Sequence, residues 1–299
     1  DADFRAPALL RANPCLDGIV RGEGEEPLRL VLRRLAGLDP APWGETPGLA
    51  VRSGEGLKFH PPPDPLPMER LPFFHLAPEL DRGGPRTMIL EVARGCRRRC
   101  VYCGYGAQSL GKRTRPLRQI VRALRAFSAG GGGVVALLDP GMNQDRRRFR
   151  AILRHVAACG NLKVKGLELN PDRLGPDDVP WLSRVVDGPV SLGLQSTQPA
   201  ALQAVGRWYR KRAFRDLLAS LREAGLYVSV DMIVGLPGDD LDGFRRSMDD
   251  VFAFFPNYVC FYPLQVLPGS RLPDLAERWD LRYQENPPYQ LLSTATFSA

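Results

Sequence analysis

From residue 87 onward, short apolar runs alternate with longer segments in which apolar residues recur every three or four positions. The short runs predict buried strands, and the longer segments predict amphipathic helices. The six expected strands are Thr87–Ala93, Val134–Leu138, Leu162–Leu169, Val190–Leu194, Tyr227–Val234 and Val259–Val266. The six expected helices lie near 116–128, 144–158, 177–186, 199–205, 210–224 and 240–255. This order favours βαβ units with parallel strands, which is an α/β fold.

The first 86 residues have a different pattern. No helix or strand signal is present in Asp1–Pro7, whereas Asp17–Val20 predicts a strand, followed by a Gly turn and a helix over 28–35. This β–α unit is typical of the end of a doubly wound domain, here residues 1–36. Residues 37–86 are rich in Pro and Gly and predict a linker with a hairpin at 49–59.

Charge and composition narrow the class of protein. The formal net charge is +8, but most of the 41 basic residues are arginine, and the chain has 30 Gly and 28 Pro. This pattern favours a compositional bias over a selected basic surface, so a nucleic-acid partner is not expected. The sequence has neither an apolar run long enough for a membrane helix nor a signal segment, which predicts a cytoplasmic protein without a membrane partner. Because the chain does not begin with methionine, we expect an N-terminal truncation.

Three of the six cysteines, Cys96, Cys100 and Cys103, stand within eight residues directly after the first strand of the α/β region. Thiolates are soft ligands that suit iron–sulfur clusters and zinc. Three cysteines reach three corners of a cubane and leave one metal corner open. The zinc alternative needs a fourth ligand, and neither His75 nor His155 stands at the usual spacing.

The motif C-x3-C-x2-C, with Tyr102 before its last cysteine, resembles the signature of the radical S-adenosylmethionine superfamily. The resemblance implies that Cys96, Cys100 and Cys103 hold a 4Fe–4S cluster. It also implies that the methionyl amine and carboxylate of S-adenosylmethionine chelate the fourth iron, and that Tyr102 lies near the adenine.

Weaker likenesses suggest further cofactor contacts. The turn with Gly235 and Pro237 resembles the segment that lies against adenine, and it also fits an ordinary strand-to-helix turn. Gln195 and Ser196, at the end of the fourth strand, resemble residues that meet the ribose or the amino-acid part of the cofactor. Ser196 also fits a simple helix cap.

Two carboxylates are candidates for the methionyl amine. Many members of the superfamily carry Gly-Gly-Glu at the second strand, whereas this chain has Leu-Leu-Asp139-Pro-Gly. Asp139 is therefore expected to replace the glutamate. Glu168 is a candidate for the ribose or the amine, with an ion pair at the barrel rim as the alternative.

The details of strands two, three, four and six resemble the subgroup of radical enzymes with a cobalamin-binding domain. The implied fold is a partial (β/α)6 TIM-like barrel over 87–280, preceded by the remnant of a doubly wound cobalamin-binding domain and followed by a C-terminal extension over 281–299. The cobalt-ligating histidine motif of such domains is absent from this sequence, so cobalamin is an optional cofactor whose binding domain is incomplete here.

The implied function is reductive cleavage of S-adenosylmethionine, which starts radical chemistry on an unidentified small-molecule or peptide substrate, with cobalamin-assisted methylation as one outcome. The reductant would be a flavodoxin or ferredoxin, and no catalytic side chain is identified. One alternative is an iron–sulfur electron-transfer or binding module, which the missing fourth cysteine disfavours. The other is an RNA-modifying radical enzyme.

Overall fold

The computed structural model describes residues 2–54, 56–72, 86–105 and 111–297. It divides into two compact units, Asp1–Leu71 and Pro72–Ala299, which we describe separately. Part of the expected linker, residues 73–85, lies outside the described residues. No helix among the described residues has the length and hydrophobicity that crossing a bilayer requires.

The first unit is a three-stranded antiparallel sheet with two helices. Its elements are α1 (Ala2–Ala12), β1 (Gly18–Val20), α2 (Glu25–Leu35), β2 (Leu49–Ser53) and β3 (Gly56–Phe59), with a 3-10 turn at Trp43–Glu45. The expected hairpin is present as β2–β3, and β1 pairs antiparallel with β2. Within the described part of this unit no strand pair is parallel, which differs from the pattern of a doubly wound domain.

The prediction that the chain start lacks structure was wrong, because α1 occupies it. A proline inside a helix costs about 3 kcal/mol, and Pro7 lies inside α1. Ala6 and Leu10 are fully buried and pack with Ile19 and Ala50. Burial of this helix face therefore outweighs the local propensity on which the prediction relied.

The second unit contains the predicted parallel strands in two adjoining sheets. One sheet has the order β4-β7-β8, and the other has the order β12-β11-β10-β9. Their bounds are β4 Thr87–Glu91, β7 Gly133–Leu138, β8 Leu162–Val164, β9 Leu167–Leu169, β10 Val190–Gln195, β11 Val228–Val234 and β12 Tyr258–Pro263.

The predicted strand Leu162–Leu169 is two strands instead of one. Gly166 separates β8 from β9 with a φ of +68°, a conformation that favours glycine. A Cβ at this position would come within 2.8 Å of the Pro189 carbonyl oxygen. The break therefore follows from a close approach of two backbone segments, which the apolar pattern of this stretch does not signal.

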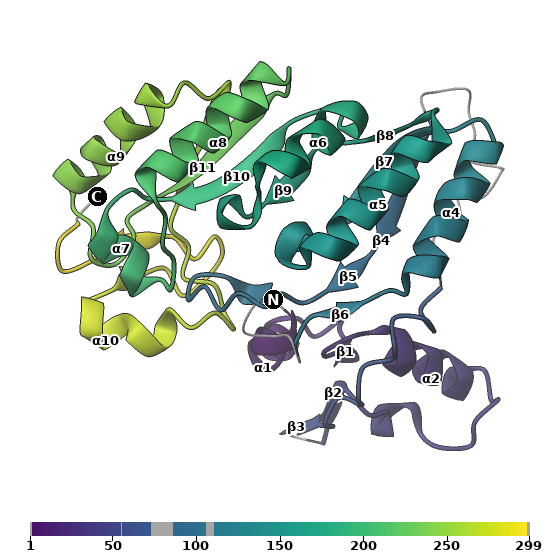
Figure 1. Ribbon diagram of the computed structural model, residues 1–299. Coiled ribbons are helices and arrows are strands. Elements are labelled where there is room, and N and C mark those ends of the chain that lie inside the picture. The colour runs from purple at the N-terminus through teal and green to yellow at the C-terminus, as the bar shows by residue number, and fades with distance from the viewer. Residues whose placement is uncertain (1, 55, 73–85, 106–110, 298–299) are drawn as a thin grey trace. The chain divides into compact units, whose positions relative to one another are not determined.

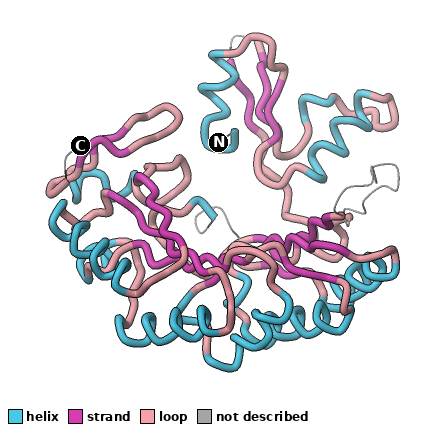
Figure 2. Tube along the Cα trace, turned by 90° about the horizontal axis from the view of Figure 1, so that it is seen from above, coloured by secondary structure: helices cyan, strands magenta, loops and turns pink. Residues whose placement is uncertain are grey.

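All six helices predicted for this region are confirmed, and they cover the convex side of the curved strand wall (Figures 1 and 2). They are α4 Leu117–Ala129, α5 Arg146–Cys159, α6 Val179–Val185, α7 Pro199–Ala204, α8 Lys211–Glu223 and α9 Leu241–Ala253. Most of their buried apolar residues join the outward-facing strand residues in one large core. The concave side of the wall is left for chemistry.

A second, smaller core contains Val101 from the cysteine motif together with Ile233, Leu264 and Leu281. The surrounding short elements are β5 Ala93–Arg94, β6 Arg113–Thr114, α10 Ala276–Trp279, β13 Arg282–Tyr283 and β14 Leu291–Ser293, with 3-10 turns at Met142–Gln144, Pro171–Arg173, Pro176–Asp178 and Pro273–Leu275. This core joins the loop that carries the three cysteines to the C-terminal part of the unit.

Candidate active site at the cysteine loop

The cysteine loop follows β4 and β5 at the carboxyl ends of the parallel strands. Gly95 has a φ of +77°, a left-handed conformation that turns the chain out of β5 into the loop. The Cys103 amide donates to the Cys100 carbonyl over 3.1 Å, which makes a tight turn. Val101 is buried, and its amide donates to the Val205 carbonyl over 3.4 Å. The loop is thus anchored by its backbone and by one apolar side chain.

Gln144 binds the first half of this loop. Its Nε2 donates to Cys96 Sγ over 2.9 Å, and its Oε1 accepts from the Arg97 amide over 3.0 Å. A Cβ at Gly141 would lie 2.3 Å from Gln144 Nε2, so a glycine there leaves room for the amide. Sequence reasoning did not identify Gln144, because the glutamine and the cysteine are 48 positions apart.

Arg207 binds the second half of the loop and was also missed. Its Nη1 lies 3.8 Å from Cys100 Sγ, and its Nη2 donates to the Gly193 carbonyl. Burial opposes the charged form, but Tyr102 and Cys100 beside it raise the pKa of Arg207 overall. Its buried Nε has no hydrogen-bond partner in the part of the chain that the structure describes. The residue therefore has a donor to spare beside a cysteine.

Tyr102, which stands between Val101 and Cys103, is partly buried, and its ring packs against the second core. Burial, and then the neighbouring Cys100, raise the pKa of Tyr102 well above its ordinary value. The phenol is therefore neutral at all physiological pH values. It offers an apolar ring and an un-ionised hydroxyl beside the thiols.

The donor set of the loop fits an iron–sulfur cluster, because three thiols on one short loop supply three soft ligands. Cys100 is buried, while Cys96 and Cys103 are partly exposed. Among the described residues, no three Cys, His, Asp or Glu side chains are gathered closely enough to enclose a metal ion. The loop thus presents its ligands together in sequence, without their converging on one point.

The carboxylate of Asp139 forms an ion pair with Lys112. Lys112 Nζ lies 2.6 and 2.9 Å from its two oxygens and also donates to the Gly141 carbonyl over 2.6 Å. Both side chains of this pair are only 3% exposed. Asp139 is therefore no open carboxylate for a methionyl amine, and the ammonium beside it belongs to Lys112.

Gln195 and Ser196, the two candidates at the end of the fourth strand, lie in different surroundings. Gln195 has a φ of +79° at a bulge in β10, and a Cβ on Gly193 would lie 2.7 Å from its Nε2 and 3.7 Å from Arg207 Nη2. Gln195 thus lies near Arg207 and the cysteine loop. In contrast, the Ser196 hydroxyl is buried, accepts from the Gln198 amide over 3.0 Å and lies 3.4 Å from Asp239 Oδ2.

The remaining predicted residues lie on β9 and after β11. Gly235, with a φ of +87°, opens the turn, and Pro237 is buried within it. A Cβ on Gly235 would come 2.9 Å from Leu291, so the C-terminal segment lies close to this turn. Glu168 stands in the middle of β9 and is exposed.

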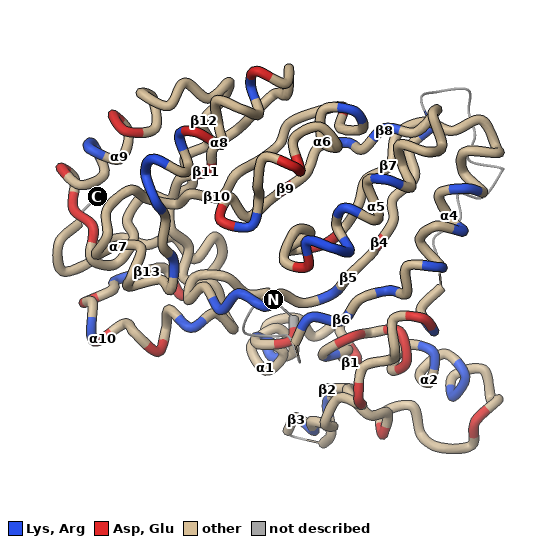
Figure 3. The backbone as a smooth tube through the Cα atoms, viewed as in Figure 1, with Lys and Arg blue, Asp and Glu red and all other residues tan. Residues whose placement is uncertain are grey.

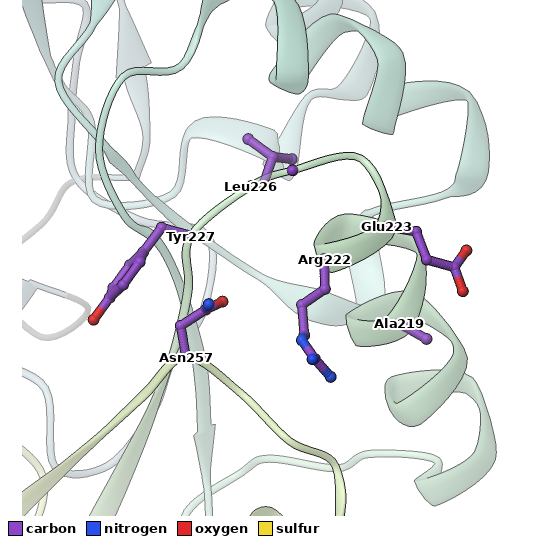
Figure 4. A pocket seen from close by; sticks show the side chains of 7 residues that line it. Ala219, Arg222, Glu223, Leu226, Tyr227 and Asn257 are labelled. Atoms are coloured by element: carbon purple, nitrogen blue, oxygen red, sulfur yellow. The ribbon is translucent and has the colours of Figure 1, made fainter.

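A hollow of about 530 Å³ lies at the opposite, amino ends of the strands, lined by Arg222, Tyr227 and Asn257 among others (Figure 4). It begins where β11 begins and contains none of the predicted site residues. We place the candidate site at the cysteine loop, because the chemically specific side chains are there.

The fold and the loop define an α/β enzyme whose site is built at the carboxyl ends of parallel strands. Residues 90–251, more than half of the chain, match the Radical SAM superfamily. The chain belongs to this superfamily, whose members use a 4Fe–4S cluster and S-adenosylmethionine. Membership decides against a mere electron-transfer module.

Two curated relatives are similar in sequence. The tRNA-2-methylthio-N(6)-dimethylallyladenosine synthase of Bifidobacterium longum subsp. infantis is 29% identical over 54% of this chain and 36% of the relative. The ribosomal protein uS12 methylthiotransferase RimO of Desulforudis audaxviator is 28% identical over 89% of this chain and 57% of the relative. The chain thus spans about a third to just over half the length of these relatives.

Two solved structures share the fold. The radical S-adenosylmethionine methyltransferase TsrM of Kitasatospora setae, with cobalamin and a [4Fe-4S] cluster bound, has a TM-score of 0.75 at 18% identity, over 96% of this chain and 62% of that one. The cobalamin-dependent enzyme OxsB has a TM-score of 0.64 at 16% identity, over 92% of this chain and 41% of that one. These similarities establish a common fold.

Proposed function

We propose that this chain holds a 4Fe–4S cluster through Cys96, Cys100 and Cys103 and cleaves S-adenosylmethionine reductively to start radical chemistry on a substrate. The observation that carries the proposal is the anchored loop of three thiols at the carboxyl ends of the strands, inside a region that matches the superfamily. When bound, the reduced cluster supplies the electron that breaks a carbon–sulfur bond of the cofactor.

The residues of the chain would position the cofactor. Arg207 offers its spare N–H to the methionyl carboxylate, because a guanidinium binds carboxylates through paired donors. Gln195 supplies an amide beside it, and the un-ionised Tyr102 supplies an apolar surface for the adenine. Asp139 is left out of this set, and Ser196 belongs to a buried network with Asp239 and Ser247.

Anaerobic reconstitution tests the cluster. We expect about four irons per chain, as for one 4Fe–4S centre, in the unmodified protein. Cys96→Ala, Cys100→Ala and Cys103→Ala should each abolish iron uptake and formation of 5′-deoxyadenosine. Cys159→Ala is the matched control, because this thiol ends α5 away from the loop. Stoichiometric zinc without iron uptake would contradict the proposal.

Cobalamin-assisted methyl transfer is the finer form of this function. The similarity to TsrM covers 96% of this chain and that to OxsB 92%, so the match to TsrM includes most of residues 1–36, which we interpret as the remnant of a cobalamin domain. We expect weak binding of hydroxocobalamin by this chain and tight binding once an upstream segment is added. Absorption titration of both proteins checks this, and tight binding by the present chain would contradict the remnant interpretation.

A second candidate is modification of RNA. It is favoured by the names of the sequence relatives, one of which acts on tRNA, and by the net charge of +8. Against it, α8 and α9 carry acidic as well as basic residues, although α4 and α5 carry basic residues alone (Figure 3). A gel shift with tRNA at low and high salt decides, since binding driven by phosphate contacts weakens steeply with salt. Without a shift at low salt, this candidate fails.

A further inference from the structure

Two carboxylates on the concave side of the second sheet have no cationic partner among the residues that the structure describes. Glu168 on β9 is in register with Ser191 on β10, and Asp231 on β11 is in register with Gly193 on β10. Residues in parallel register point to the same side of a sheet, and Ser191 and Gly193 are two positions apart on one strand. Both carboxylates therefore face away from Leu192, which lies between Ser191 and Gly193 and packs in the core with the helices. The helices cover the convex side of the strand wall (Figure 2), so the carboxylates face the concave side.

The contacts of Asp231 leave one oxygen unused. Its Oδ2 accepts from the Ser191 hydroxyl over 2.8 Å, and Ser191 in turn accepts from the Ser229 hydroxyl over 2.9 Å. Its Oδ1 is buried and has no hydrogen-bond partner among the described residues. A buried oxygen without a partner destabilises the folded chain. Such an oxygen is expected where a bound ligand donates the missing hydrogen bond.

Glu168 likewise forms no hydrogen bond or ion pair with any described residue, although it is exposed on the same surface. By contrast, Asp139 and Asp178, elsewhere in the unit, are each held by a lysine or arginine. The chain is rich in arginine, so the missing partners on the concave surface do not follow from a shortage of cations.

The neighbouring strand adds two protic side chains to this surface. Cys260 on β12 is in register with Asp231, and Tyr262 follows two positions later. Tyr262 is 52% exposed. Its hydrogen bond with Cys260, then partial burial and the charge of Asp231, raise its pKa to about 12. The negative charges of the carboxylates thus act on Tyr262 on the neighbouring strand, and no described cation neutralises them.

We propose that Asp231 and Glu168 bind the cationic end of the substrate, an amine or a guanidinium, with Ser191 and Tyr262 as its hydroxyl neighbours. This inference rests on the proposed function, because it places the substrate on the concave wall beside the cysteine loop. A metal ion is a poorer occupant, since no three ligating side chains of the described residues are gathered there.

S-adenosylmethionine is the competing cation, because it carries a sulfonium and an amine. Arg207 donates to the carbonyl of Gly193, the residue in register with Asp231, but it forms no ion pair with Asp231. Asp231 stands three residues before the end of β11, about 13 Å from the turn at Gly235. Asp231 therefore lies deeper in the wall than the turn expected to contact the cofactor, which favours the substrate as its ligand. The experiment must distinguish binding of the substrate from binding of S-adenosylmethionine.

The test uses the full, cluster-loaded chain with S-adenosylmethionine bound, and two probes of equal length, n-pentylamine and n-pentanol. Ligand-observed NMR titration should show an affinity for the amine about tenfold higher than for the alcohol. Asp231→Asn and Glu168→Gln should each remove most of this preference. Glu223→Gln, an exposed carboxylate on α8, is the control and should keep it.

Two further measurements make the outcome unambiguous. The melting temperature of Asp231→Asn should stay equal or rise, because the change removes a negative charge whose buried Oδ1 has no described partner. A fall would assign Asp231 a structural role and overturn the proposal. An equal loss of affinity for S-adenosylmethionine would assign both carboxylates to the cofactor and also overturn it. Formation of 5′-deoxyadenosine without any amine preference would sink this inference alone, whereas an amine preference without that product would sink only the proposed function.

Discussion

The two halves of the strand wall differ in whether their polar side chains have partners within the protein. In the half formed by β4, β7 and β8, the polar residues at the carboxyl ends are bound by other protein groups, as in Asp139 with Lys112 and Gln144 with Cys96. Between the halves, Asn143 Nδ2 donates to the Asn170 carbonyl over 2.8 Å. In the half formed by β9 to β12, Asp231 retains a buried oxygen without a described partner, and Glu168 forms neither a hydrogen bond nor an ion pair with the described part of the chain.

The concave surfaces of the two halves also differ in polarity. Ile89 on β4 and Leu138 on β7 are each about half exposed there, whereas the second half carries carboxylates and hydroxyls. Polar groups that are bound by other protein groups, such as Asp139 and Gln144, position the segments around the cysteine loop. Unsaturated groups cost stability and are expected where a ligand completes them. The comparison therefore separates the part of the site that holds the loop from the part that binds small molecules.

The largest expected effect follows from breaking the Asp139–Lys112 pair. Asp139→Ala leaves a buried ammonium unpaired and should lower the free energy of unfolding by about 3–5 kcal/mol, as measured by urea denaturation. The double variant Asp139→Ala with Lys112→Met should recover most of the loss, because both charges are then removed. The control Asp177→Ala should cost little, since its carboxylate is 79% exposed. Unchanged stability with weakened cofactor binding would return Asp139 to the cofactor site.

An intermediate effect is expected at Arg207, which touches the loop and still has a donor free. Arg207→Gln should weaken binding of S-adenosylmethionine about 10–100-fold, the equivalent of roughly 1.5–3 kcal/mol for hydrogen bonds to a charged group. Equilibrium dialysis with the cluster-loaded protein measures this. Arg154→Gln, whose guanidinium lies over Trp181, is the control. Lost iron with unchanged cofactor affinity would show that Arg207 supports only Cys100.

The smallest effect concerns Gln144, whose amide nitrogen donates to Cys96 Sγ and whose amide oxygen accepts from the Arg97 amide. Gln144→Ala removes an N–H donor from Cys96 and should lower the reduction potential of the cluster. A shift of roughly 50 mV corresponds to about 1 kcal/mol for a one-electron couple. Redox titration followed by electron paramagnetic resonance measures it, and Gln203→Ala, an exposed helix residue, serves as the control. An unchanged potential with full iron content would show that the hydrogen bond does not persist in the loaded enzyme.

The sequence by itself determined the parts of this protein that depend on local patterns. Apolar periodicity located the strands and helices of the second unit, because each element buries one side over consecutive residues. The spacing of Cys96, Cys100 and Cys103 determined the chemistry of the loop, since three ligands within eight residues need no distant partner. It failed at Gly166 and at α1, where a close backbone approach and long-range burial outweigh local preference.

Only the tertiary structure decided which polar residues are already occupied. Arg207 meets Cys100 from 107 positions away, and Lys112 meets Asp139 from 27 positions away. No local pattern encodes such pairs, because they arise where strand ends and loops converge after folding. For the same reason the sequence treated Asp139, Glu168 and Ser196 alike as cofactor ligands. Folding pairs Asp139 with a lysine and buries Ser196 in a network, whereas Glu168 and Asp231 face the concave side without a cationic partner among the described residues.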